Sequence, residues 1–241
     1  MGSFLVLLLG EIQRMKKYNI LAASVLISLI WIGIMHFTGI HDVTQIFPLF
    51  IFLDVTSMSI LLIGVTMFFE KQEGIIKTLM VSPISKAEYI LAKTFANSIS
   101  NIETLIILYV YAKLFKEINI NMVGLFSAVV LVSFFHSLIG FVFTYYSKDF
   151  TRLLMWMITY SFVFMTPVLL EQVGMIRNEG MKKIFYVIPT KTSMILLNAS
   201  TGGIKPWEVY LSVFYLLIIS ILLYFVVLKK FDEFAIKESG V

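Results

Sequence analysis

Two carboxylic acids lie inside long apolar stretches of this sequence. Asp54 lies in the stretch 46–69, and Glu103 lies in the stretch 94–115. An ionised carboxylate is unfavourable in hydrocarbon, so such a side chain normally faces the interior of a helix bundle or water. Helical rise places the two acids at similar depths, and no basic residue lies deep in any apolar stretch to pair with them.

A polar stripe flanks the second acid. Asn97, Ser100, Asn101 and Thr104 recur at the spacing of one helix face, with Glu103 at its edge. Two interpretations stay open. Asp54, Glu103, Asn97 and Asn101 form either a polar, acidic surface along a route through a membrane or a subunit contact, or else they only fix helix packing through hydrogen bonds.

Other reactive groups are sparse. None of His36, His41 and His136 has a partner at metal-ligand spacing, there is no GxxxxGK[ST] nucleotide loop, and there is no cysteine. We therefore predict no catalytic residue, no metal site and no cofactor bound by this chain. An intramembrane enzyme would require the fold to bring Asp54, Glu103 and His136 together, and an ion-coupled secondary carrier would use the two acids.

The composition points to a membrane. The 241 residues are 59% hydrophobic and 14% charged, whereas soluble domains contain about 25% charged residues. The net charge of +4 is explained by basic residues that flank membrane spans, so lipid is an expected partner and nucleic acid is not.

Six apolar stretches approach or exceed the roughly 20 residues that a membrane-spanning helix needs. They predict an all-α membrane protein with a single transmembrane domain over residues 1–241. The predicted spans are 20–37, 46–69, 94–115, 122–146, 153–170 and 209–228.

The arrangement of lysine and arginine predicts the orientation. Twelve of the 19 basic residues fall in the segments that share a side with the N-terminus, which places both termini in the cytoplasm. Residues 1–18 carry their charges after an apolar run, unlike a signal peptide, and predict an amphipathic helix on the inner membrane surface. A frayed start of the first span is the alternative.

Two links between spans are unusually long. The outer link 171–207 contains the apolar runs 184–188 and 194–197, separated by Pro189. Each run is too short to cross a membrane, so we expect re-entrant helices before the last span, with an ordinary folded loop as the alternative.

The inner link 70–93 predicts a short amphipathic helix over residues 71–82. Ile75, Ile76, Leu79 and Met80 share one face. Ser82 and Pro83 end the helix, because proline disfavours helical geometry in the residue before it. Ser85 and Glu88 then form the capping-box pattern of a new helix.

This link resembles the coupling segment of the ABC-2 type transporter permease family. The matching residues are Glu70, Glu73, Gly74, Leu79, Ser82, Pro83, Ser85, Glu88 and Lys93. One departure is Ile75 after the glycine, where the family often has a basic residue and a threonine nearby. The rest of the chain resembles the family in layout only.

The resemblance implies the permease subunit of an ATP-binding-cassette exporter in a bacterial plasma membrane. A coupling helix would dock into a separate ATP-binding subunit, which would hold ATP and Mg²⁺, and a second permease copy or homologue would complete a dimer. The substrate would be a drug, a peptide or another amphipathic compound. The residues expected to couple to the ATPase are Glu70, Glu73, Gly74, Ile75, Ile76, Leu79, Ser82 and Pro83.

Overall fold

The computed structural model describes residues 3–239, and its account of side chains leaves out Ser3, Met80, Glu179 and residues 237–239. Within these limits the chain is mostly helical and has no β-strand, which confirms the predicted all-α class. The α-helices are α1 (Ser3–Lys17), α2 (Ile20–Phe37), α3 (Phe47–Gln72), α4 (Ile75–Val81), α5 (Lys86–Phe115), α6 (Met122–Tyr146), α7 (Phe150–Tyr160), α8 (Thr166–Gln172), α9 (Glu179–Ile184), α10 (Pro189–Asn198) and α11 (Pro206–Ser239).

Six helical stretches in the described chain are long and apolar enough to cross a membrane. They are α2, α3, α5, α6, α11 and the unit formed by α7, the π-helical segment η1 (Ser161–Met165) and α8. Helices α2 and α6 coincide with the predicted spans, whereas α5 begins eight residues before residue 94 and α11 continues to Ser239. The prediction followed apolar character alone, and these helices extend into polar sequence because they keep packing partners there.

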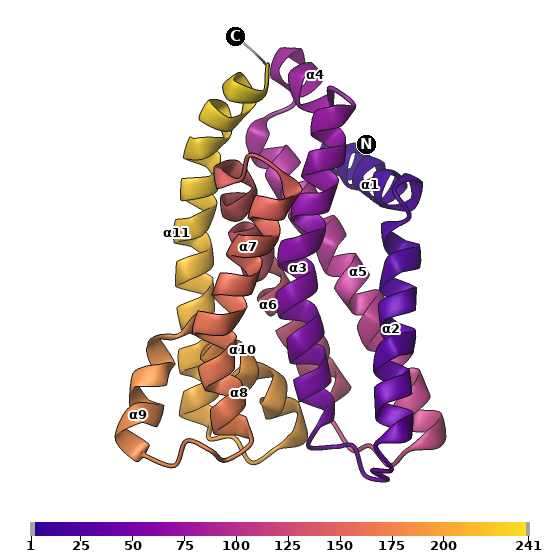
Figure 1. The fold of residues 1–241 in the computed structure, drawn as a ribbon, viewed down its shortest axis with the longest axis vertical. Coiled ribbons are helices and arrows are strands. Elements are labelled where there is room, and N and C mark those ends of the chain that lie inside the picture. The colour runs from indigo at the N-terminus through magenta and orange to yellow at the C-terminus, as the bar shows by residue number, and fades with distance from the viewer. Residues whose placement is uncertain (1–2, 240–241) are drawn as a thin grey trace.

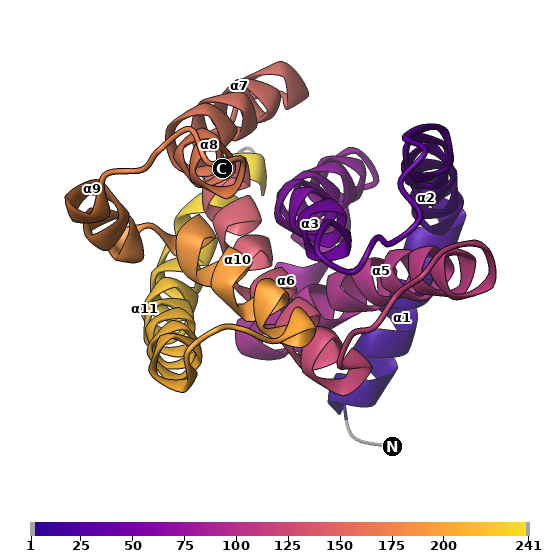
Figure 2. The ribbon, with the colours of Figure 1, turned by 90° about the horizontal axis from the view of Figure 1, so that it is seen from below.

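Helices α3 and α6 form the centre of the bundle (Figure 2). Their backbones approach closely at Gly140, where a β-carbon would lie 2.9 Å from the carbonyl oxygen of Ile60. Small residues allow such contacts between membrane helices, which associate through packing more than through hydrophobic exclusion from water.

The fifth span is broken by a wider turn. Between α7 and α8 lies a π-helical segment, η1 (Ser161–Met165), followed by Pro167. Proline has no N–H to donate and its ring displaces the carbonyl four residues earlier, so it locally prevents regular α-helical bonding.

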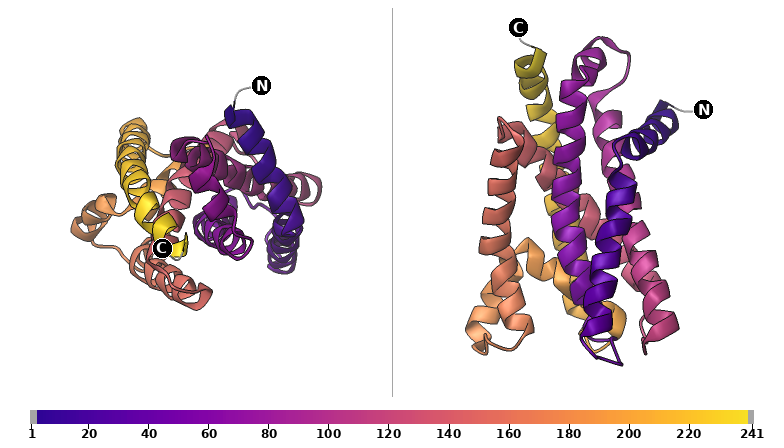
Figure 3. Two further views of the ribbon diagram at one scale, coloured as in Figure 1. Left: turned by 90° about the horizontal axis from the view of Figure 1, so that it is seen from above. Right: turned by 45° about the vertical axis from the view of Figure 1, so that its right-hand side comes forward.

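Helix α1 lies across the bundle near one end, beside α2 and α5 (Figures 1 and 3). Leu5, Val6 and Leu9 are exposed, whereas Glu11 and Met15 are buried against the long helices. This confirms the predicted N-terminal helix and its two-sided character. Helix α4 and the C-terminal end of α11 lie at the same end of the molecule (Figure 1).

The opposite end carries α9, η2 (Phe185–Val187), α10 and η3 (Ala199–Thr201). Helix α10 packs against α3, α6 and α11, and most of its side chains are buried. The predicted short helices are therefore present. Protein covers α10, as the non-spanning backbone of a re-entrant segment requires.

Candidate functional sites at the α4 end and in the bundle

Helix α4 begins directly after a sharp turn. Helix α3 ends at Gln72, and Gly74 adopts the left-handed conformation with φ of 70°. Side chains with a β-carbon rarely adopt this conformation, so the position favours glycine. The predicted helix 71–82 is thus the last turn of α3, a glycine turn and the seven-residue helix α4.

The apolar face of α4 points toward the bundle. Ile76 is buried in a cluster with Phe231 and Phe234 of α11, and Leu79 is packed against the same cluster. The sequence interpretation had this face meeting a partner. An amphipathic helix at the end of a bundle instead buries its apolar side on its own chain, because that removes apolar surface from water.

The outward face of α4 carries different residues. Lys77, Thr78 and Val81 are exposed, and Val81 is 86% exposed. Glu73 and Pro83 are also exposed, whereas Ile75 and Ser82 are half-buried beside them. These residues make up the surface that α4 offers to another molecule.

Helix α5 starts as the sequence predicts. The Ser85 hydroxyl accepts a bond from the Glu88 backbone N–H at 3.2 Å, and the Ser85 N–H donates to the Glu88 carboxylate at 3.3 Å. This is a complete capping box. It fixes the direction in which the chain leaves the α4 segment.

A buried ionic cluster joins α1, α3 and α5 just below α4. The Lys93 ammonium donates to Glu11 at 2.9 Å and to Glu70 at 2.7 Å. Arg14 pairs with Glu11 and lies 3.1 Å from Glu70, and the Tyr89 hydroxyl donates to Glu70 at 2.5 Å. Although burial opposes ionisation, the neighbouring Lys93 and Arg14 hold the pKa of Glu11 below its usual range.

Glu70 therefore lies inside the cluster and is fully buried. It presents no surface to a partner and instead ties the end of α3 to its neighbours. Sequence reasoning missed Glu11 and Arg14 as members of this site. Charges near the predicted ends of three helices were a signal, but their pairing depends on how the helices cross.

Glu73 makes the second link between α1 and the α3–α4 turn. Its carboxylate accepts from the Lys17 ammonium at 2.7 Å and from the Tyr18 hydroxyl at 3.0 Å. These two donors lower the pKa of Glu73. Unlike the cluster around Glu70, this contact is open to water.

Asp54 is buried in the bundle and accepts a bond from the indole N–H of Trp31 at 3.2 Å. Glu103 lies on a more exposed side of α5, next to Ile99 and Ile106, which are both exposed. Within residues 3–239, one Glu103 oxygen is buried without a hydrogen-bond partner, and no hydrogen bond or ion pair joins the two acids.

Asn97 and Asn101 connect α5 to α3 and α6. The Asn97 amide donates to the Ser59 carbonyl at 2.9 Å and to the Ser137 hydroxyl at 2.8 Å. The Asn101 amide donates to the Ser133 hydroxyl at 2.8 Å and to the Ser59 hydroxyl at 3.0 Å. Both side chains are buried, and these bonds serve helix packing.

His136 is bonded to the Val132 carbonyl at 2.8 Å and to the Tyr160 hydroxyl at 3.2 Å. Neither of these bonds reaches Asp54 or Glu103. Among the described residues no group of three potential ligands could hold a metal ion.

Comparison with known proteins places the chain in a family. A family model described as the fluoroquinolones export permease protein family matches residues 4–239. The chain belongs to the fluoroquinolones export permease protein family. It is also 24% identical over 237 residues to two proteins named fluoroquinolones export permease protein, MT2761 and Rv2687c, and the match covers 96% of this chain and 95% of each relative. They come from Mycobacterium tuberculosis strains CDC 1551 / Oshkosh and ATCC 25618 / H37Rv.

The family match extends from the first turn of α1 to the end of α11. The surface helix, the six apolar spans, α4 and the short helices at the opposite end therefore all lie within the matched region. Membership in this permease family and six apolar helices make the chain a multi-pass membrane protein.

Proposed function

We propose that this chain is the membrane-spanning permease subunit of an ATP-driven drug exporter. Its substrates are planar aromatic amphiphiles of the fluoroquinolone kind, as the names of its relatives suggest. ATP and Mg²⁺ bind to a separate ATP-binding subunit, and two permease copies, or one copy and a homologue, form the transporter. The chain itself is not an enzyme.

The observation that carries this proposal is the way in which α4 is attached to the helix bundle. The helix is short, it projects at one end of the bundle, and it is anchored through Ile76 to α11. The buried cluster of Lys93, Glu11 and Glu70 joins the helices immediately below it. A push on α4 is therefore transmitted to several spans at once, as motor-driven rocking of helices requires.

The outer face of α4 forms the docking surface in this proposal. Lys77, Thr78, Val81 and the flanking Glu73 and Pro83 meet the ATP-binding subunit. Gly74 makes the turn, and Ile75, Leu79 and Ser82 lie at the edge of the contact. Glu70 and Ile76 act from behind, because both are buried.

A cross-linking experiment tests this assignment. The permease is co-expressed with a candidate ATP-binding subunit, and a photo-activated amino acid replaces Val81. The matched control replaces Val123, which is 77% exposed and lies in the first turn of α6, at the other end of the molecule. We expect a cross-link to the ATP-binding chain from position 81 and none from position 123.

The same experiment can contradict the proposal. The photo-activated residue is also placed within residues 148–152 and at the end of α11, and cross-links from these positions, with none from residues 70–83, would remove α4 from the docking surface. A complex that shows no ATP-dependent drug transport in inverted vesicles would contradict the proposed function itself.

A further inference from the structure

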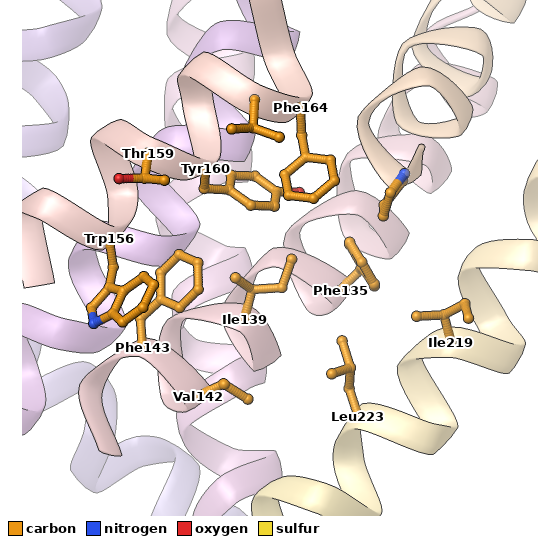
Figure 4. A pocket seen from close by; sticks show the side chains of 12 residues that line it. Phe135, Ile139, Val142, Phe143, Trp156, Thr159, Tyr160, Phe164, Ile219 and Leu223 are labelled. Atoms are coloured by element: carbon orange, nitrogen blue, oxygen red, sulfur yellow. The ribbon is translucent and has the colours of Figure 1, made fainter. Parts of the chain in front are cut away.

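An aromatic cavity opens between α6, α7 with η1, and α11 (Figure 4). Its volume is about 390 Å³ and its lining is almost wholly apolar. Its lining includes Ile139 of α6, Leu223 of α11, which lies across from α7 (Figure 4), and Pro189 at the start of α10. Small-molecule sites typically occupy about 300–1,000 Å³ and are lined mainly by apolar and aromatic side chains.

The α7 wall of this cavity is a row of aromatic rings. Trp156, Tyr160 and Phe164 follow one another at four-residue spacing and all face the cavity (Figure 4). Phe143 of α6 stacks with Trp156, with ring centroids 6.1 Å apart and planes at 25°. Tyr160 is held by its bond to His136. Rings arranged in this way offer flat faces and edges to another flat aromatic molecule.

The row depends on the irregular fifth span. Phe164 belongs to η1, where the turn is wider than in an α-helix, and its ring lies 5.1 Å from that of Tyr160. Single π-helical turns inside α-helices frequently occur at functional sites. Here the turn is one of the elements that shape the cavity.

The cavity continues toward the end of the molecule where α4 lies. A second hollow of about 300 Å³ shares Val142, Phe143 and Trp156 with the first and reaches Tyr146 at the end of α6. Beyond it, the Arg152 guanidinium lies 5.5 Å from the centre of the Trp156 ring. The two hollows therefore have an apolar aromatic lining, and a cation packs on Trp156, which lines both of them.

We propose that this aromatic cavity is a lateral binding site that takes planar aromatic amphiphiles bearing an acidic group directly from the inner leaflet. The inference rests on the proposed function, because it deepens the substrate assignment. Exposed apolar residues, Ile158 on α7 and Ile218 and Leu222 on α11, flank the cavity and are suited to lipid. The ring system of the ligand stacks along Trp156, Tyr160 and Phe164, while its carboxylate pairs with Arg152.

The rigid aromatic row and the cation favour this ligand over a lipid chain. A flexible acyl chain would bury apolar surface here but cannot stack on the rings and loses conformational freedom, whereas a rigid fused ring system stacks at lower entropic cost. An anionic group at one end of the ligand matches the placement of Arg152 beside Trp156. Norfloxacin, a fluorescent fluoroquinolone with a fused ring system and a carboxylate, is a suitable probe.

The three tryptophans of the chain allow a direct binding test. Trp31 and Trp207 are replaced by phenylalanine so that all tryptophan fluorescence comes from Trp156. The full chain is then placed in lipid nanodiscs. Norfloxacin is then titrated, and quenching of Trp156 is measured. Thr159→Phe narrows the cavity, because Thr159 lines it, and Ile158→Phe adds the same ring one residue earlier on an exposed position outside the lining.

We expect saturable quenching whose Kd rises by about tenfold or more in Thr159→Phe and changes by less than about twofold in Ile158→Phe. Arg152→Gln is also expected to weaken binding, and less so for a methyl ester of the probe. Quenching that grows linearly with probe in the lipid, and equally in all variants, would show partitioning only and overturn the site.

Three further outcomes distinguish failure of this inference from failure of the proposed function. Val163→Cys tests whether a second copy covers the cavity. If disulfides form between copies, and Trp156 becomes more accessible to a soluble quencher when the copies dissociate, a second copy fills the cavity and the inference fails. If Thr159→Phe exports norfloxacin normally with the motor present, the exporter assignment stands while the lateral site fails. Saturable binding without ATP-driven export under any conditions would support the lateral site and contradict the exporter assignment.

Discussion

At the scale of single residues, Lys93 has the most demanding environment. Its ammonium group is buried, and it bridges the buried carboxylates of Glu11 and Glu70. A buried charge is tolerated only when it is paired and hydrogen-bonded. Removing one partner therefore costs more than the pair itself contributes, because an uncompensated charge stays behind.

We predict that Lys93→Met destabilises the protein by about 3–5 kcal/mol, since two buried acids would lose a buried counter-ion and keep Arg14 beside them. The measurement is thermal or denaturant unfolding of the purified chain in detergent. The matched control is Lys86→Met, which removes an exposed pair with Asp232 and should cost only about 0–1 kcal/mol. Equal effects of the two substitutions would show that the cluster has no special role.

The residue scale also shows where sequence reasoning stops. The residue types at Asn97, Asn101 and Asp54 predict a polar surface inside a membrane protein. The sequence does not decide whether this surface lines a transport route or only holds helices together. The serines on α3 and α6 that accept bonds from the Asn97 and Asn101 amide groups come from distant parts of the chain. Nothing in local spacing pairs them, so only the fold shows that the two amides bond to α3 and α6.

At the scale of elements, most helices could be predicted because each is defined by local chemistry. The spans follow from apolar length, and the start of α5 follows from the capping box at Ser85. The direction in which α4 faces could not be predicted. Its amphipathic pattern showed that one face is buried, but whether the bundle or a partner buries it depends on α11. The π-helical turn before Pro167 was likewise missed, although the proline was a usable signal.

The contact between α1 and the α3–α4 turn is expected to depend on pH. Hydrogen bonds from Lys17 and Tyr18 lower the pKa of Glu73 in the folded state. A group of this kind contributes stability above its unfolded pKa, and the contribution is lost as the pH falls through the lowered folded value. The Glu73 contact should therefore loosen in acid and stay formed at neutral pH, while the buried cluster around Lys93 still holds α1 beside α3 and α5.

Spin labels can measure this loosening, because the chain has no cysteine of its own. Cysteines replace the exposed residues Lys16 and Gln72, and the distance between the labels is followed from neutral pH to about pH 3. We expect the distance distribution to broaden only at acidic pH. In Glu73→Gln it should already be broad at neutral pH and insensitive to acid, and a sharp, pH-independent distance in both proteins would refute the link.

At the scale of the whole molecule, the two ends of the bundle differ. One end gathers α1, α4 and the last turns of α11, and the other gathers the links after α2, α5 and α8 (Figure 1). Twelve of the 19 lysines and arginines belong to segments at the first end. Basic residues beside spans favour the cytoplasmic side. The fold gathers the basic segments at the end that carries α4, so the charge pattern assigns that end to the cytoplasm.

We therefore predict that the α4 end faces the cytoplasm. Single cysteines at Thr78 in α4 and at Asn119 in the link between α5 and α6 are both exposed and report on opposite ends. A membrane-impermeant thiol reagent added to intact cells, without the ATP-binding subunit, should label Asn119→Cys and leave Thr78→Cys unmodified. Inside-out vesicles should give the reverse. Labelling of Thr78→Cys in intact cells would place α4 outside, where no ATP-binding subunit could reach it, and would remove the basis for its coupling role.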